Sequence, residues 1–139
     1  MRHFTGLECP DRISTLSRIR VLSSAPDRIA GCVYQSSNGI SGVLRSHPAG
    51  ASGRVAETFR TRFSQAGFAE VRLSGAAESG LSFRTGETEG KTRCETLWRF
   101  AGEGADYTLW LVYTLPAQAE TIGPLVAAFA RHLATSQAR

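Results

Sequence analysis

The cysteines have the widest chemical range of the side chains in this sequence, and there are three: Cys9, Cys32 and Cys94. Cys94 could act as a nucleophile if a neighbouring base or cation lowered the pKa of its thiol. No histidine lies near it in sequence, and strand alternation places it on the same face as Trp98 and Phe100. We therefore predict a buried, unreactive thiol.

The spacing of the cysteines does not fit a metal site, because none forms a C-x-x-C pair and the histidines lie far away in sequence. We predict no metal and no cofactor. Cys9 and Cys32 could form a disulfide in an oxidising compartment, closing a loop of about 23 residues. The first residues lack the apolar segment of a secretory signal. The default expectation is a cytoplasmic protein, or a periplasmic or secreted one if a signal has been removed.

Two histidines are candidates for binding or acid–base roles. His47 lies in the loop predicted after the first hairpin, and loops often carry functional groups. His132 lies in the last turn of the final predicted helix, where we expect it to interact with the terminal carbonyls and the helix dipole. One hypothesis is therefore a small enzyme whose site assembles from distant residues around His47 and Cys94.

Acidic side chains that could pair for acid–base catalysis cluster in predicted hairpin turns: Glu87, Glu89, Glu103 and Asp106. Charges in turns usually serve solubility, so we assign no catalytic residue. The segment 86–92, Gly-Glu-Thr-Glu-Gly-Lys-Thr, resembles a phosphate-binding loop. It has three residues between its glycines where that motif has four, and strands are predicted on both sides. We predict a solvated hairpin turn there.

Aromatic residues near the end of the chain indicate a binding surface. The segment 107–114 is apolar on both faces, which predicts a central strand covered on each side. If one helix covers its face incompletely, Tyr107 and Tyr113 would line an apolar groove with Arg93 or Arg99 at its edge. The favoured hypothesis is a non-enzymatic binding or accessory domain that docks a protein segment or small ligand on this face. The competing interpretation is an ordinary aromatic core.

The clearest local signal is a hairpin between residues 31–35 and 40–45. Asn38-Gly39 suits the two positive-φ positions of a tight hairpin turn. A two-residue loop at this position would set Tyr34 opposite Val43, an aromatic and β-branched pair that stabilises neighbouring strands.

Two helices are predicted. Apolar residues spaced by three or four positions predict the first over 54–66, with Ser52 as its N-cap and Gly67 as its end. The second runs over 117–135, and Pro124 either kinks it or opens it at its first helical position. Its predicted buried stripe is Ile122, Leu125, Val126, Phe129 and Leu133. The other predicted strands cover residues 17–23, 68–73, 81–85, 92–100 and 107–114.

The length of 139 residues and a hydrophobic content of 42% fit one domain with one core, and exclude a disordered or fibrous chain. The longest apolar run, 125–130, is too short to span a membrane. The net charge of +4 comes from 16 basic residues, all arginine except Lys91, which are scattered singly. This scatter argues against a nucleic-acid partner. Such a partner would require four arginines on one exposed face: Arg18, Arg20, Arg28 and Arg45.

The element order is three strands, a helix, four strands and a helix. Consecutive strands joined by tight turns form an antiparallel sheet. We predict a single α+β domain over residues 1–139, with a sheet of about six to seven strands and two main helices packed on it. In this order and size the chain resembles the Mog1/PsbP-like α/β/α sandwiches. The resemblance is topological and includes no diagnostic motif, so no functional residue is carried over.

Overall fold

The computed structural model describes residues 7–25, 28–102 and 104–137. This part of the chain forms one antiparallel sheet of eight strands with two α-helices, which confirms the predicted α+β class. The strands are β1 (Arg12–Ile13), β2 (Leu16–Ala25), β3 (Arg28–Gln35), β4 (Ser41–Pro48), β5 (Ala69–Val71), β6 (Leu81–Thr88), β7 (Lys91–Ala101) and β8 (Ala105–Leu115). The helices are α1 (Ser52–Gln65), α2 (Ala119–Gln137) and the short 3₁₀ helix η1 (Gly75–Ser79). The eighth strand is β1, whose two residues are too short to show an alternating pattern.

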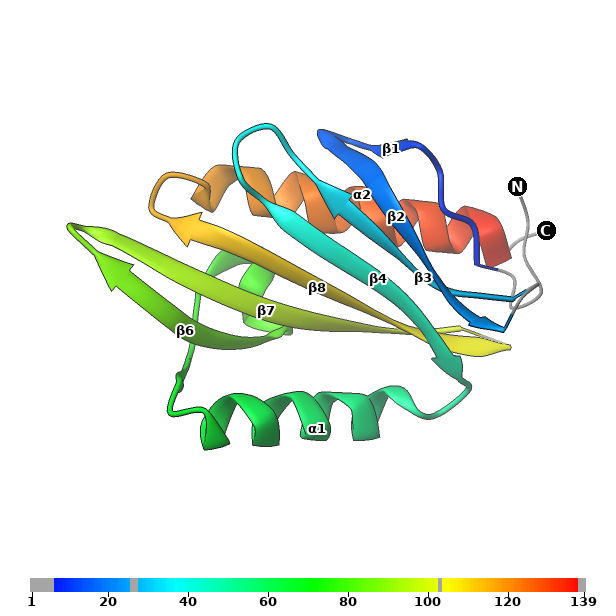
Figure 1. Cartoon of the computed structure of the whole chain (residues 1–139), viewed down its shortest axis with the longest axis horizontal. Coiled ribbons are helices and arrows are strands. Elements are labelled where there is room, and N and C mark those ends of the chain that lie inside the picture. The colour runs from blue at the N-terminus through cyan, green and yellow to red at the C-terminus, as the bar shows by residue number, and fades with distance from the viewer. Residues whose placement is uncertain (1–6, 26–27, 103, 138–139) are drawn as a thin grey trace.

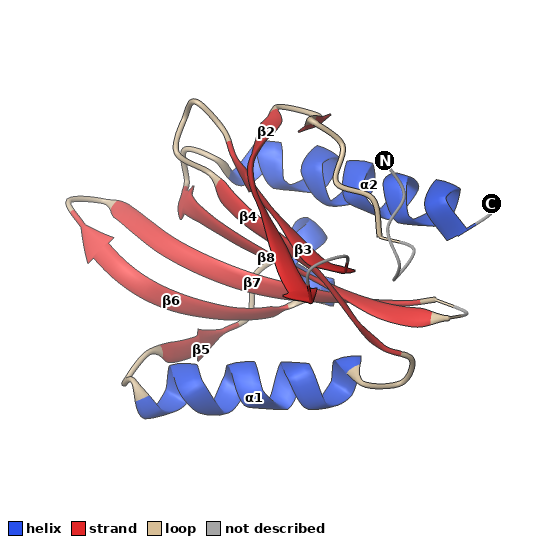
Figure 2. Ribbon diagram, turned by 45° about the vertical axis from the view of Figure 1, so that its right-hand side comes forward, coloured by secondary structure: helices blue, strands red, loops and turns tan. Residues whose placement is uncertain are grey.

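Strand β8 lies inside the sheet, whose order is β1-β2-β3-β4-β8-β7-β6-β5. Helices α1 and α2 lie on opposite faces of this sheet (Figures 1 and 2). Leu109 and Leu111 of β8 are fully buried. Between them Trp110 points to the other face, where its ring centroid lies 6.1 Å from that of Phe59 in α1. The prediction of a central strand covered on both sides is confirmed.

The hairpin of β3 and β4 forms where predicted, but its register differs by one residue. Tyr34 lies opposite Gly42 and Val33 lies opposite Val43, so the predicted pairing of Tyr34 with Val43 is wrong. Because side chains alternate along a strand, the observed register turns Val43 to the α1 face and Tyr34 to the α2 face. There the ring centroid of Tyr34 lies 5.6 Å from that of Phe129.

The register shift arises in the loop, which holds three residues rather than two. The Ser36 N–H donates to the Ile40 carbonyl at 2.8 Å, and the Ile40 N–H donates to the Ser36 hydroxyl at 2.9 Å. Gly39 has a φ of 94°, as the last position of a three-residue hairpin loop requires. The side chain of Ser36 therefore stabilises the longer loop.

Helix α1 presents its apolar stripe of Val55, Phe59 and Phe63 to the sheet, and Gly67, with a φ of 90°, follows its end. The predicted N-cap is wrong: Ala51 holds that position without a side-chain hydrogen bond, and Ser52 is the first helical residue. The helix packs mainly on β5 to β8. Strand β4 therefore lies beside α1 rather than under it.

Helix α2 covers the other face with the predicted stripe, since Ile122, Leu125, Phe129 and Leu133 are all buried. Pro124 lies inside the helix and does not open it. Within the described residues, neither α1 nor α2 is long and apolar enough to cross a membrane.

The segment that resembles a phosphate-binding loop is the tip of the β6–β7 hairpin, as predicted. Thr88 lies opposite Lys91, and the two residues between them, Glu89 and Gly90, have φ values of 42° and 79°. This is the backbone of a two-residue hairpin turn. The segment 74–80, predicted to separate two strands, contains η1.

Candidate functional site

The strand register separates the two pairs of residues that were expected to share a groove. Arg99 lies opposite Thr108 and Arg93 lies opposite Thr114, so both arginines are on the α1 face. Tyr107 and Tyr113 alternate with these threonines along β8 and lie on the α2 face. The expected groove of two tyrosines with an arginine edge therefore does not form.

The two tyrosines belong to the core under α2. Tyr107 is 4% exposed and Tyr113 is 2% exposed, and burial raises the pKa of both phenols. The Tyr113 hydroxyl is hydrogen-bonded to Thr96 at 2.7 Å, and Thr96 to Ser82 at 2.8 Å. These hydroxyls satisfy one another inside the sheet, as buried polar groups must.

The two arginines have structural partners on the α1 face. The Arg99 Nε–H donates to the Ser52 hydroxyl at 3.1 Å, and Arg93 lies 3.9 Å from the buried carboxylate of Glu95. Glu95 in turn accepts a hydrogen bond of 3.0 Å from the indole N–H of Trp110.

A groove of about 330 Å³ lies between α1 and strand β4, and we call it the α1 groove. Its apolar lining comes from both elements and from the centre of the sheet: Val43, Val55, Phe59, Phe63, Leu97 and Trp110. Its polar lining is Arg45, His47, Thr58, Arg62 and Thr108. Of the predicted binding residues, only His47 lines this groove.

Aromatic rings hold the shape of the α1 groove. Phe59 and Phe63 stack at 4.2 Å between ring centroids, and both meet the ring of Trp110 edge-on, at 6.1 Å and 6.4 Å. Edge-to-face contacts at these distances are favourable for aromatic rings. The hydrogen bond from Trp110 to Glu95 fixes the indole from below. The aromatic wall is therefore preformed.

His47 lies in the last part of β4, not in a loop, and is hydrogen-bonded through Nε2 to the Thr108 hydroxyl at 2.8 Å. Its pKa is lowered first by burial and then by Arg45, while Asp106 opposes the change. The imidazole is therefore neutral at pH 7 and offers hydrogen bonds rather than charge.

The prediction that Asp106 is a solvated turn residue is wrong. It lies in β8, is 4% exposed, and its Oδ2 accepts a hydrogen bond of 2.9 Å from the Ser52 N–H at the start of α1. Hydrogen bonds from Ser52 and Gly50 lower its carboxyl pKa. Glu87 and Glu89 do lie at the β6–β7 hairpin tip and are exposed, and Glu103 lies outside the described residues.

Cys94 lies on the α2 face and is 1% exposed, so the prediction of a buried thiol is confirmed. Burial raises its pKa, which makes the reactive thiolate scarcer. His47 lies on the α1 face, at the far end of its strand from the β3–β4 loop. The fold therefore does not bring Cys94 and His47 together.

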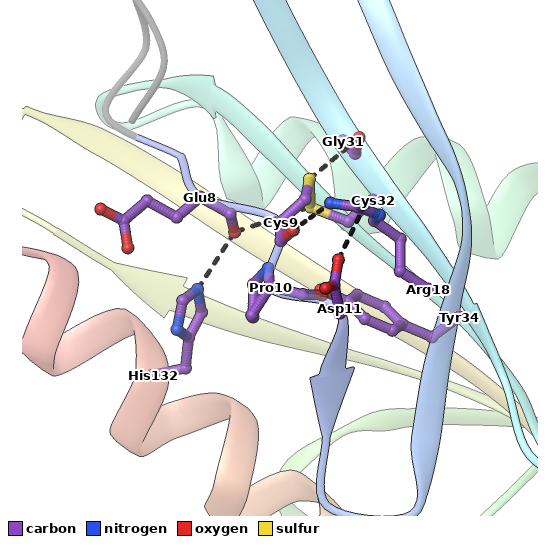
Figure 3. Close-up of a disulfide and its surroundings, with 9 residues drawn as sticks. All are labelled: Glu8, Cys9, Pro10, Asp11, Arg18, Gly31, Cys32, Tyr34 and His132. Carbon is purple, nitrogen blue, oxygen red and sulfur yellow. Dashed lines mark hydrogen bonds and ion pairs between the residues drawn. A yellow bond between two sulfur atoms is a disulfide. The ribbon is translucent and has the colours of Figure 1, made fainter. Parts of the chain in front are cut away.

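Cys9 and Cys32 form a disulfide, with 5.6 Å between their Cα atoms (Figure 3). This distance lies in the usual range for disulfides. The bond fastens the segment 7–11, which we call the N-terminal strap, to strand β3. Other contacts hold the strap as well: the Tyr34 hydroxyl donates to the Pro10 carbonyl at 2.9 Å.

His132 and Arg18 also bind the N-terminal strap (Figure 3). His132 Nε2 is 3.1 Å from the Glu8 carbonyl oxygen, so its predicted contact with the carbonyls of its own helix is wrong. Arg18 donates to the Cys9 carbonyl at 2.6 Å and lies 2.9 Å from the Asp11 carboxylate. Both side chains are therefore bound to the strap.

The four arginines that a nucleic-acid surface would need do not share one face. Arg18 lies opposite Tyr34 on the α2 face, whereas Arg20 lies opposite Val33 on the α1 face, because a bulge intervenes. Arg45 is on the α1 face with Arg20. The side chain of Arg28 lies outside the described residues.

Two other cavities differ from the α1 groove in character. A polar one of about 590 Å³ lies on the opposite side of α1, and its Arg60 is paired with Glu57 and Glu70. An apolar one of about 300 Å³ lies between η1 and α2, where Leu73 and Ile122 line it. Among the described residues, no three metal-binding side chains come together.

No family model matches this chain, and neither a curated protein nor a solved structure is detectably similar to it. The resemblance to the Mog1/PsbP-like sandwiches therefore stays a prediction.

Proposed function

We propose that this protein is a non-enzymatic binding domain that holds the apolar part of a small ligand in the α1 groove. The observation that carries the proposal is the preformed aromatic wall beside a part-open groove of about 330 Å³. Ligand sites are concave and mostly apolar, with a few placed polar groups, and span roughly 300–1,000 Å³. The volume favours a small molecule over a protein segment.

The positions of the reactive side chains favour binding over catalysis. A nucleophile needs a base within hydrogen-bonding distance. Cys94 and His47 lie on opposite faces of the sheet, and His47 is hydrogen-bonded to Thr108. The hypothesis of an enzyme built around these two residues therefore loses its geometric basis.

The disulfide supports an oxidising compartment as the place of this activity. Disulfides persist in secreted and periplasmic proteins and are rare where thiols are kept reduced. The Cys9–Cys32 bond joins the N-terminal strap to the sheet beneath it. We therefore place the proposed binding function outside the reducing cytoplasm.

The fluorescence of Trp110 tests the proposal directly, because its ring lines the groove. Trp98, the other tryptophan, lies on the α2 face with its indole N–H bonded to Ala76, so Trp98→Phe leaves Trp110 as the reporter. Titration with the neutral probe 4-phenylbutan-1-ol should change the Trp110 emission with a saturable curve.

The matched control fills the groove. Val43→Phe, in the apolar lining, should abolish the response to 4-phenylbutan-1-ol. Val33→Phe introduces the same ring at the position opposite Val43 in β3, outside the lining, and should leave the response intact. An unchanged response in the Val43→Phe protein would place binding elsewhere and refute the proposal.

A further inference from the structure

The polar lining of the α1 groove has one sign of charge. Its ionisable side chains are Arg45, His47 and Arg62, and none of the described residues that line it is acidic. Arg45 comes from β4 and Arg62 from α1, so the positive groups approach from both walls. A cleft lined by one sign of charge concentrates ligands of the opposite sign.

The two arginines of the α1 groove are not among those of the described residues that pair with a carboxylate, although several arginines elsewhere are likewise unpaired. Arg60, Arg84 and Arg93 each lie within 4 Å of a glutamate carboxylate. Among the described residues, no carboxylate lies that close to Arg45 or Arg62. Asp106, which lies opposite His47 in the register, is hydrogen-bonded to Ser52 at the start of α1.

We infer that the ligand of the α1 groove is a small acid, with an aromatic or other apolar body and a carboxylate that pairs with Arg45 and Arg62. This inference rests on the proposed binding function and specifies its ligand class. Guanidinium groups match the planar carboxylate with two parallel N–H donors, and such charge-assisted hydrogen bonds are about twice as strong as neutral ones.

The rest of the lining fits the same ligand. Phe59, Phe63 and Trp110 present ring faces and edges that a second aromatic ring contacts favourably. His47 is held neutral by burial and by Arg45, so it adds a hydrogen bond without a charge. The site thus combines an apolar floor with two positive groups at its rim.

Three probes share one apolar body and differ in their polar group, so they separate the contribution of the carboxylate to affinity from that of the body. They are 4-phenylbutyrate, 4-phenylbutyramide and 4-phenylbutylamine. Kd values come from Trp110 fluorescence in the Trp98→Phe protein. The acid should bind about tenfold more tightly than the amide, since the extra free energy of a charged hydrogen bond over a neutral one corresponds to roughly that factor in Kd. The amine should bind most weakly. The preference for the acid should shrink as NaCl is raised.

The variant Arg45→Gln/Arg62→Gln should bind the acid and the amide equally. The control Arg60→Gln/Arg84→Gln also removes two positive charges, but from outside the groove, and should keep the preference for the acid over the amide. Circular dichroism establishes that each variant folds. The NaCl titration of the Trp98→Phe protein, which keeps Arg45 and Arg62, tests the inference without any arginine variant. Equal affinity for the acid and amide in that protein would overturn the inference and leave the binding function standing. Failure of all three probes and of 4-phenylbutan-1-ol would overturn both.

Discussion

The Asp106 carboxylate in β8 accepts a hydrogen bond of 2.9 Å from the backbone N–H of Ser52, the first residue of α1. A helix begins with N–H groups that have no partner within the helix and a partial positive charge. The sheet supplies the missing acceptor here, because Ala51 at the N-cap position provides none. The contact fixes the start of α1 against the sheet, at Asp106, which lies opposite the groove residue His47.

Asp106→Asn should destabilise the fold, lowering the melting temperature by a few degrees at pH 7. The folded-state pKa of Asp106 lies below the ordinary value of 3.8. Its stabilising effect is therefore complete above pH 3.8 and is lost as the pH falls through the folded-state pKa. Thermal unfolding at pH 7 and at pH 3 should show the difference between the two proteins narrowing in acid. A constant difference would mean that the charge of Asp106 is not involved.

Removal of the disulfide with Cys9→Ser/Cys32→Ser should lower the free energy of unfolding by about 3 kcal/mol. The bond constrains the unfolded chain, because it joins residues that are 23 positions apart. Urea denaturation measures the change. Thiol titration of the denatured, unreduced protein should find one thiol, that of Cys94, and three after reduction. Three thiols before reduction would refute both the bond and the oxidising compartment.

Gly31→Ala should cost about 1–3 kcal/mol, because the new Cβ would lie 2.8 Å from the backbone oxygen of Leu44, which cannot move away cheaply. Gly86→Ala is the matched control in another strand. Its Cβ would lie 3.5 Å from the nearest atom, an ordinary contact, and the free energy of unfolding should change by about 0.5 kcal/mol or less. Equal effects in the two variants would contradict the close approach of β3 and β4.

The pKa of His47 should rise towards 6.5 in Arg45→Gln, since Arg45 is one cause of its lowering. In the parent protein the pKa of His47 is lowered, so the imidazole takes up a proton at a lower pH in the folded state than in the unfolded chain. Stability is therefore lost as the pH falls below 6.5. NMR titration of the imidazole measures its pKa. The other charged groups that face this side chain are Asp106 and Arg62, and both are unchanged in the variant. Arg60→Gln, outside the groove, should not change the pKa of His47.

The fold could be predicted from the sequence where local pattern determines structure. The apolar segment 107–114 predicted a central strand, and four of the five residues predicted for the stripe of α2 are buried, the fifth, Val126, partly so. The hairpin register was missed because it depends on the Ser36 side chain, which closes a longer loop than Asn38-Gly39 alone favours.

The candidate site could be predicted only in part, because it depends on which face each strand turns to α1. A groove does lie beside α1, but its aromatic lining is Phe59, Phe63 and Trp110 rather than the two tyrosines. One signal was present: Val43, Arg45 and His47 alternate along β4, and so share a face. Local patterns could not give the position of α1, because it depends on long-range contacts such as those between Asp106 and Ser52 and between Phe59 and Trp110.

The most direct test of the binding function is an NMR measurement of intermolecular nuclear Overhauser effects with bound 4-phenylbutan-1-ol. The structure predicts contacts from the phenyl protons to the methyl groups of Val43 and Val55, on the two walls of the α1 groove. Contacts to Leu73 and Ile122, in the apolar cavity between η1 and α2, would contradict it.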